Sequence, residues 1–454
     1  MSWLLTPSIN TNIAERLSDD RTSFHIFKYF STGAIRHNVF KTLDRKKDTR
    51  SAALRGDIDV VKWLFPLLDK EKDKFTLKGM FMKATDNKCS DVVKFLAENG
   101  CPMHTETANS LISGGYLEEL KMVINNRLKL DDEEVYDLQL YFPDICSTAA
   151  CEGYLDMLIW LHEKGCNWDK YTCASAASKG HIHILKYAHE NGCPWHDLTC
   201  KVAANTGNIE CLKYAHLNGC PVNEETCEAA ADGGHLDCLV YLHDNGCPWD
   251  EKTCTRAANG GHLDCLVYLH EHGCPWDEKT CASSANIDIL KYVHENGCPW
   301  NELTCKDAVK HGRFDCLMYA HENGCPWNET VCYTAAKEGK LDMLKYAHEN
   351  GCPLDEDICH IAARKGMLDI LKYAHENGCP WDEDTCLFAT SSGHLDCLKY
   401  AYEKGCPWDS RLFEMTYREI KRMKIKASIR SIGSNIRSVF ACIQFAVENN
   451  CPRA

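Results

Sequence analysis

Cysteine and histidine are the residues of this chain that could carry chemistry, because both bind zinc and both recur at fixed spacing. Nine successive cysteines of Gly-Cys-Pro motifs are separated by seven steps of 27 residues and one of 24, and a second set follows seven residues later. Zinc sites pair cysteines two to four residues apart, whereas Cys247 and Cys254 are seven apart. We therefore expect no metal and no cofactor. The first set is Cys193, Cys220, Cys247, Cys274, Cys298, Cys325, Cys352, Cys379 and Cys406.

A third cysteine position supports an apolar rather than a ligating role. The position of Cys265 exchanges freely with methionine and isoleucine in other copies, for example at Met343 and Ile370. No basic residue recurs beside the cysteines to lower a thiol pKa, so we expect neither redox activity nor disulfides. Thirty cysteines without a signal peptide predict a reducing compartment. We expect the cytoplasm, the host cytoplasm if the protein is viral, with the nucleus as the alternative.

Histidines form a ladder of their own, one in each copy. Imidazoles with a pKa near 6.5 could make the chain sensitive to pH. A histidine in every copy leaves no unique pocket for catalysis, and no nucleophile elbow, phosphate loop or zinc-protease signature occurs, so we expect no enzyme. We expect half-buried histidines that hydrogen-bond to the neighbouring copy. The ladder comprises His162, His189, His216, His243, His270, His294, His321, His348 and His375.

Two short helices must position these residues in each copy. One copy reads WDEKTCTRAANGGHLDCLVYLHEHGCPWD, with apolar residues at helical spacing in two blocks. Asp250 is a good N-cap, so the first helix is predicted from Glu251 to about Asn259, and Gly261 follows its end. The second helix is predicted from about Leu263 to Glu271, with Gly273 as its C-terminal cap.

These residues resemble the ankyrin repeat. GHLDCLVYLHEHGCPWD, from Gly261 to Asp277, is similar without a gap to the second half of that repeat, and Ala257 and Ala258 match its paired alanines. The copy is shorter than the family's 33 residues, and the missing six fall where the family has its β-hairpin finger. The resemblance implies an all-α, ankyrin-like solenoid of about 13 copies plus divergent caps. Such shortened repeats also resemble those abundant in large amoeba-infecting DNA viruses and some protists.

Breaks in the period divide the chain into five segments. The copy at 281–292 lacks three residues, which predicts a local kink. A basic stretch at 411–430 is read as a solvated helical face, with nuclear targeting or contact with an anionic surface as alternatives. The segments are an N-terminal non-repeat or capping segment (1–47), divergent repeats (48–126), an insertion (127–143), regular repeats (144–409), and a basic helical segment with a divergent C-terminal cap (410–454).

Variation among copies points to a binding surface. The residue after the first-helix cysteine changes in size and charge from copy to copy, while the alanines and glycines around it hardly change. In ankyrin-like stacks the first helix lines the concave side, so the resemblance implies that this position contacts a partner. We expect the loop tryptophans to pack between repeats instead. The predicted partner-binding residues are Lys201, Glu228, Thr255, Lys306, Tyr333, His360 and Leu387.

These features predict a scaffold that binds another protein on the concave first-helix face. The alternative is an adaptor, for example for a ubiquitin ligase, that recruits substrates and uses its N-terminal segment to reach other machinery. The net charge of −14 opposes phosphate backbones, so we expect a protein partner that could be basic, and no nucleic acid. No apolar stretch suits a membrane, and we expect a monomer.

Overall fold

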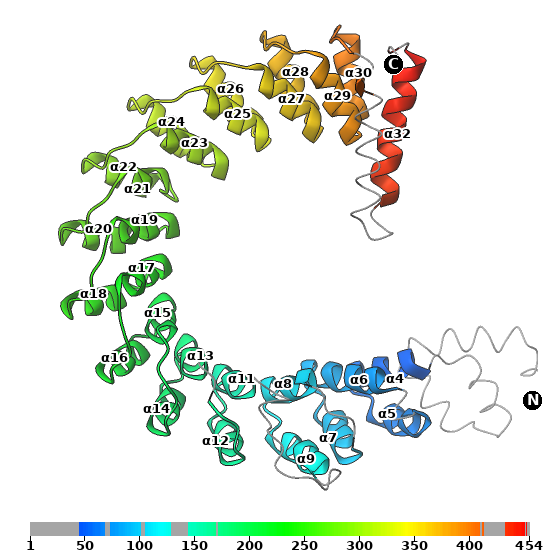
Figure 1. Ribbon diagram of the computed structural model, residues 1–454, viewed down its shortest axis with the longest axis vertical. Helices are drawn as coiled ribbons and strands as arrows, with labels where there is room; N and C mark the ends of the chain where they lie inside the picture. The colour runs from blue at the N-terminus through cyan, green and yellow to red at the C-terminus, as the bar shows by residue number, and fades with distance from the viewer. Residues whose placement is uncertain are drawn as a thin grey trace, which may run out of the picture. The chain divides into compact units, whose positions relative to one another are not determined.

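The chain folds as an all-α helical repeat solenoid (Figure 1). The computed structural model describes residues 45–68, 73–100, 105–128, 144–168, 171–408, 411–412, 432–449 and 451, and every regular element in them is a helix. They fall into two compact units, Met1–Val222 and Asn223–Ala454. The expected N-terminal segment, apart from the start of α4, most of the insertion and most of the basic segment lie outside the described residues.

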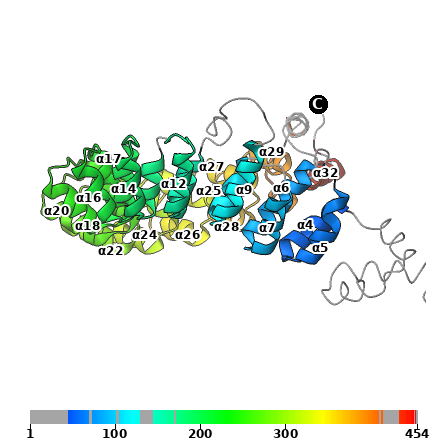
Figure 2. The ribbon, with the colours of Figure 1, turned by 90° about the horizontal axis from the view of Figure 1, so that it is seen from below.

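The first unit consists of helix pairs in which α4 lies beside α6 and α5 beside α7 (Figure 2). Helix α9 continues to Leu128, two residues into the segment expected as an insertion. The elements are α4 (Arg45–Arg55), α5 (Ile58–Leu64), the 3-10 helix η1 (Phe65–Leu67), α6 (Lys74–Asp86), α7 (Ser90–Glu98), α8 (Thr105–Ser113), α9 (Leu117–Leu128), α11 (Ile145–Glu152), α12 (Leu155–Glu163), α13 (Thr172–Ser178), α14 (Ile182–Glu190), α15 (Leu198–Asn205) and α16 (Ile209–Leu217).

The second unit continues the alternation of first and second helices, with the odd-numbered first helices in one row and the even-numbered second helices in another (Figure 1). Its helices are α17 (Glu224–Gly233), α18 (Leu236–Asp244), α19 (Glu251–Gly260), α20 (Leu263–Glu271), α21 (Glu278–Ala282), α22 (Ile287–Glu295), α23 (Glu302–His311), α24 (Phe314–Glu322), α25 (Glu329–Lys337), α26 (Leu341–Glu349), α27 (Glu356–Lys365), α28 (Leu368–Glu376), α29 (Glu383–Ser392), α30 (Leu395–Glu403) and α32 (Ile432–Glu448).

Local signals set the ends of each helix. Asp250 has extended backbone, and its side chain accepts a hydrogen bond from the Lys252 N–H at 3.1 Å within a capping box closed by Thr253. Gly261 ends the helix in the left-handed conformation, with φ 86°. The predicted helices of this copy are therefore confirmed to within one residue at Gly260.

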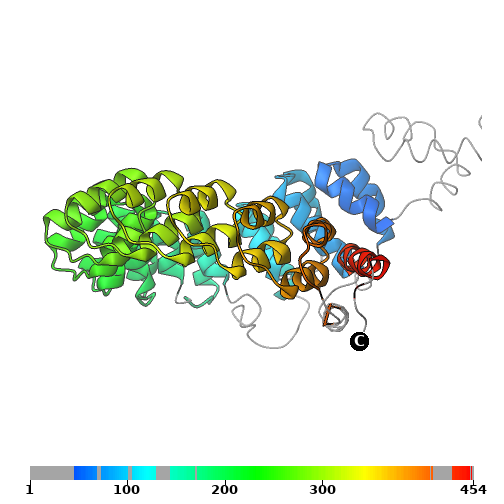
Figure 3. The ribbon, with the colours of Figure 1, turned by 90° about the horizontal axis from the view of Figure 1, so that it is seen from above.

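Helix α32 covers the end of the second unit. It packs against both α29 and α30 (Figures 1 and 3), and the side chains of Val439, Cys442 and Ala446 on its inner face are fully buried. The ring of Phe445 meets the edge of Tyr402 in α30, with ring centroids 5.6 Å apart. This single long helix shields apolar surface that the last repeat would otherwise expose.

Candidate protein-interaction surfaces

The histidine ladder holds neighbouring copies together. His270 stacks on Trp276 with ring centroids 4.0 Å apart, and its Nδ1 lies 3.0 Å from the hydroxyl of Tyr292 in the next copy. Both rings are half-buried, which confirms the expected packing of these histidines and tryptophans. The tyrosine was not singled out from the sequence, although it recurs in almost every second helix. The same bond joins His189 to Tyr214, His243 to Tyr268, His294 to Tyr319 and His348 to Tyr373.

The cysteine ladders have a structural role. The thiol of Cys274 donates to the carbonyl of Asp250, the residue that caps the first helix of the same copy, at 3.3 Å. The thiol of Cys254 in turn points to the carbonyl of Cys274 at 4.0 Å. Burial raises the pKa of the Cys265 thiol to about 12, so this sulfur stays protonated near neutral pH. Uniform cysteines therefore supply both a small buried body and a weak donor.

No three His, Cys, Asp or Glu side chains of the described residues gather into a group that could hold a metal ion. Within the same residues, no helix has both the length and the apolar character needed to cross a bilayer.

The seven predicted contact residues lie along the sides of the first helices. None of them is fully exposed. Glu228 lies 3.8 Å from Arg256 of the next first helix, and the Thr255 hydroxyl lies 3.2 Å from that of Thr280. Lys201, Lys306 and Tyr333 are half-buried, and the ammonium of Lys337 lies 6.0 Å from the centre of the Tyr333 ring.

His360 shows how this position joins consecutive copies. Its Nε2 lies 2.7 Å from Oδ1 of Asp382, the N-cap of the next first helix, and its ring meets the edge of Phe388. Burial alone would raise the pKa of Asp382, but the hydrogen bond and charge of His360 and two backbone N–H groups together lower it below its usual value. The carboxylate therefore remains ionised to a lower pH than that of an isolated aspartate.

Leu387 corrects one expectation. Leu387 is one of the predicted partner-binding residues, but only 7% of it is exposed, so its removal would leave a cavity in the fold. The physical reason is that the residue after the first-helix cysteine faces the adjoining first helix, where its size and charge match a local neighbour. Variation at this position therefore reports packing between copies as well as any partner.

Exposed first-helix side chains lie instead two residues after the cysteine in α19 and five residues after it in α23, α25 and α27. Arg256 in α19, Lys310 in α23, Lys337 in α25 and Arg364 in α27 are exposed there. These positions also vary in charge between copies, so the same comparison of repeats could have found them if helical spacing had been applied to each face.

The outer side of the second helices has a cation over an aromatic ring in several copies. The ammonium of Lys345 in α26 lies 5.7 Å from the centre of the Tyr373 ring in the next second helix. The same arrangement joins Lys372 to Tyr400 at 5.9 Å and Lys291 to Tyr319 at 5.7 Å. These lysines are therefore engaged within the chain, and cation–π attraction of this kind contributes about 0.5–1 kcal/mol at exposed sites.

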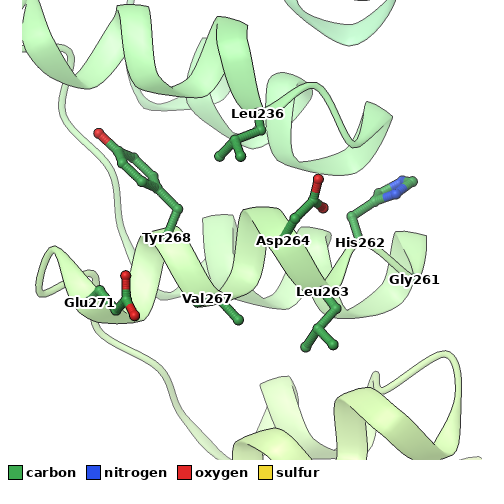
Figure 4. Close-up of a pocket in the computed structure, with 8 residues that line it drawn as sticks. All are labelled: Leu236, Gly261, His262, Leu263, Asp264, Val267, Tyr268 and Glu271. Atoms are coloured by element: carbon green, nitrogen blue, oxygen red, sulfur yellow. The ribbon is translucent and has the colours of Figure 1, made fainter.

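An open depression of about 730 Å³ lies over α20 on this outer side (Figure 4). Leu236 of α18 contributes one wall, and Leu263, Val267 and Tyr268 of α20 contribute apolar surface. Asp264 and Glu271 add two exposed carboxylates. In Figure 4, Tyr268 and Asp264 point toward the side of α18, whereas Leu263 and Val267 point toward the following repeat.

Comparison with known proteins finds similar architecture only among solved structures. No protein-family model and no curated protein matches the sequence. The chain is similar to the pentatricopeptide repeat protein PPR10 in complex with an 18-nt psaJ RNA element, with 12% identity, TM-score 0.36, and coverage of 97% of this chain and 74% of that one. PPR10 from maize matches with 12% identity, TM-score 0.29, and coverage of 98% and 89%. The human ASB11 ankyrin repeat domain matches with 20% identity, TM-score 0.25, and coverage of 40% and 84%.

These matches correct the expectation about nucleic acid. The net charge of −14 does not exclude a nucleic-acid partner, and PPR10, to which the chain is similar, is bound to RNA in its structure. A net charge describes the whole chain, whereas binding depends on the charges of one face. The chain is a helical repeat protein.

Proposed function

We propose that this protein is an interaction scaffold whose first helices bind a partner protein. One observation supports this most strongly: the buried positions of successive first helices are nearly constant, whereas the exposed ones vary between copies. Thr253, Cys254, Ala257 and Ala258 of α19 are fully buried, and threonine, cysteine and alanine recur at those positions in most copies. A row of changing exposed side chains on a constant framework provides a surface with no need for an enclosed pocket.

The exposed charges of three consecutive first helices form the proposed contact. Lys310, Lys337 and Arg364 occupy the same position of α23, α25 and α27, and all three are exposed. Arginine is enriched among residues that dominate binding energy, and long basic side chains also offer apolar stems. The predicted residues Lys306, Tyr333 and His360 are half-buried in the same helices and would form the base of the contact surface.

The test begins with capture of partners from extracts by the full-length protein, followed by calorimetry with the purified partner. Replacing Lys310, Lys337 and Arg364 by alanine is expected to weaken binding by about 30-fold or more, equivalent to about 2 kcal/mol. The matched control replaces Glu322, Glu349 and Glu376, three exposed residues that end the second helices of the same repeats. Melting temperatures of both variants should stay close to that of the native chain.

Two results would overturn the proposal. One is a control variant that loses binding while the first-helix variant keeps it, because the contact would then lie on the second helices. The other is a captured ligand that nuclease treatment destroys, because the scaffold would then serve a nucleic acid.

We also propose that the protein works in a reducing compartment, with the cytoplasm favoured. The cysteines of the described residues are free thiols, and nearly all of them are buried in the fold. Alkylation of the denatured protein immediately after acid quenching of cells should label essentially every cysteine. Recovery of a large disulfide-bonded fraction would contradict this location.

A further inference from the structure

One position on the outer side of the second helices separates the copies into two groups. It is lysine in nine second helices, at Lys62, Lys94, Lys121, Lys186, Lys213, Lys291, Lys345, Lys372 and Lys399. It is valine in α18 and α20, at Val240 and Val267, methionine in α24, at Met318, and isoleucine in α12, at Ile159. The neighbouring positions are almost unchanged, as LDCLVYLHE of α20 and LDMLKYAHE of α26 show.

The lysine of the first group has a defined place in the structure. Each of Lys291, Lys345 and Lys372 holds its ammonium 5.7–5.9 Å from the centre of the tyrosine ring in the next second helix. In the first unit Lys186 does the same over Tyr214 at 5.5 Å. In four copies, therefore, a lysine ammonium lies over the ring of this tyrosine.

In two consecutive copies, α18 and α20, this position carries no lysine to lie over the tyrosine of the next second helix. Val240 and Val267 precede Tyr268 and Tyr292 just as Lys345 precedes Tyr373, but valine carries no charge. Neither α18 nor α20 contains lysine or arginine, while Asp237, Asp244, Asp264 and Glu271 are all exposed on them. Tyr268 is thus framed by carboxylates that no lysine or arginine of α18 or α20 offsets.

The depression over α20 lies on the outer side of α18 and α20 (Figure 4). It is lined by Val267, which takes the lysine position, by Tyr268, and by Asp264 and Glu271. His272 lies against Tyr268 with ring centroids 4.0 Å apart, and does not line the depression. The surface therefore combines an apolar floor with negative charge at its margin.

Helix α24, which also lacks the lysine, offers an aromatic side chain to the next tyrosine instead. Phe314 of α24 meets the edge of the Tyr346 ring, with centroids 5.5 Å apart and an angle of 84°. Helix α24 thus supplies an aromatic neighbour of its own for the next tyrosine. On the two consecutive helices α18 and α20, neither a lysine nor a phenylalanine takes this place, although His272 packs against the ring of Tyr268.

We propose that the outer face of α18 and α20, formed by Leu236, Val240, Leu263, Val267 and Tyr268 with Asp264 and Glu271 beside them, binds a basic amphipathic segment of a partner protein. A lysine or arginine of that segment takes the place that Lys345 and Lys372 occupy in their copies, and apolar side chains of the segment cover the valines. The segment is basic because the margin is acidic and the chain's own precedent is an ammonium over tyrosine. This surface is separate from the first-helix contact proposed above.

The experiment uses the full-length protein and a fluorescein-labelled probe peptide with blocked ends. The probe carries leucines at helical spacing on one face and lysines beside them, and a second probe has glutamine in place of every lysine. Fluorescence anisotropy gives the affinity of each. We expect the lysine probe to bind at least tenfold more tightly than the glutamine probe.

Three variants locate the site. Val240→Lys with Val267→Lys supplies the residue of the other copies, so the fold is retained and the lysine probe is expected to bind at least tenfold more weakly. Leu217→Lys with Leu303→Lys is the matched control, since it also converts two exposed apolar residues, 77% and 38% exposed, to lysine; it should change affinity less than threefold. Lys345→Val with Lys372→Val should create a second such face on α26 and α28 and raise the number of bound probes.

Each opposite result overturns the proposal. Equal loss of affinity in the two lysine variants would show that the probe senses net charge alone. Equal binding of the glutamine probe would show that no cation is recognised. If sedimentation shows a dimer of the native chain that Val240→Lys with Val267→Lys dissolves, the face joins two copies of this chain instead.

Discussion

The regular repeat of α19 and α20 and the shortened repeat of α21 and α22 stand side by side in the second unit and differ by three residues. The three residues are missing before the second helix, and only the first helix is shorter: α21 has five residues, against ten in α19, whereas α20 and α22 both have nine. The histidine–tyrosine bond into the shortened repeat, from His270 to Tyr292, keeps its length of 3.0 Å. The comparison shows that contacts between second helices keep neighbouring repeats aligned, whereas a first helix can lose a turn.

In the shortened repeat, other local interactions replace the contacts that the missing residues make in regular repeats. In regular repeats a left-handed glycine precedes a residue such as His262, which bonds to the carbonyl of Asp232 one copy earlier at 3.1 Å. In the shortened repeat the side chain of Asn286 caps α22 instead, and the Ala285 N–H bonds to the carbonyl of Ala258 at 2.9 Å. Arg313 of the following copy then reaches the carbonyl of Ser284 at 2.6 Å, where a shorter side chain stands in regular copies.

The largest expected effect on the free energy of unfolding comes from replacing one of two glycines. Gly234 lies against a regular repeat, and Gly261 lies against the shortened repeat. Gly234 and Gly261 both have positive φ, near 73° and 86°. A Cβ at Gly234 would overlap the ring of His262, whereas at Gly261 it would meet only Ala285 and Asn286, at 3.7 and 3.9 Å. We expect Gly234→Ala to cost about 2–4 kcal/mol, from backbone strain and overpacking together. Gly261→Ala should cost about 1–2 kcal/mol, from strain alone.

Urea denaturation of the two variants measures the difference. Similar losses would show that the backbone conformation sets the cost and that the neighbouring histidine yields. The comparison between regular and shortened repeats would then have no energetic basis at this glycine.

The second effect concerns Arg313. Arg313→His should cost about 1.5 kcal/mol, because a charged hydrogen bond to the Ser284 carbonyl is lost. Inserting Gly-Gly-His after Asn286 rebuilds the regular sequence, and in that background Arg313→His should be close to neutral. A double-mutant cycle by urea denaturation gives the coupling. Additive effects would mean that Arg313 does not compensate for the missing turn.

The third effect should be the same in both repeats. Tyr268→Phe and Tyr292→Phe each remove a half-buried hydroxyl that pairs with a histidine of the preceding copy. Each should cost about 1 kcal/mol, because the imidazole loses its partner. Melting temperatures of the two variants should agree. A clearly smaller loss for Tyr292→Phe would show that the deletion loosens the second-helix register.

The smallest effect is a dependence on pH at His375 in a regular repeat. Burial, followed by the charge of Lys404, lowers the pKa of His375 below its usual 6.5, while Glu376 opposes the shift. The unfolded chain therefore binds a proton more readily, so stability is complete above pH 6.5 and falls as pH decreases from 6.5 toward the folded pKa.

Thermal unfolding between pH 7.5 and 5.5 measures this loss. His375→Tyr should reduce it, since Tyr402 takes the ladder position in the last repeat and packs on Trp408 there. A native chain whose stability is flat or rises toward pH 5.5 would show that the histidines are balanced by nearby acids.

Local sequence signals are enough to predict the helices and their ends. Asp250, Gly261 and the alternation of apolar residues act within a few positions of the chain, so local chemistry is enough to place α19 and α20. The sequence also predicted the half-buried histidines and tryptophans, because their period matches the repeat.

Which side chains meet between copies depends instead on how the helices stack. Leu387 is buried, Arg313 reaches Ser284, and Lys345 lies over Tyr373, and none of these facts follows from helix propensity. The physical reason is that partners 28 or 29 residues apart are joined by the rotation and separation of stacked helices. A repeat pattern gives the period of that stacking, whereas the contacts depend on how each side chain fills the space beside the next helix.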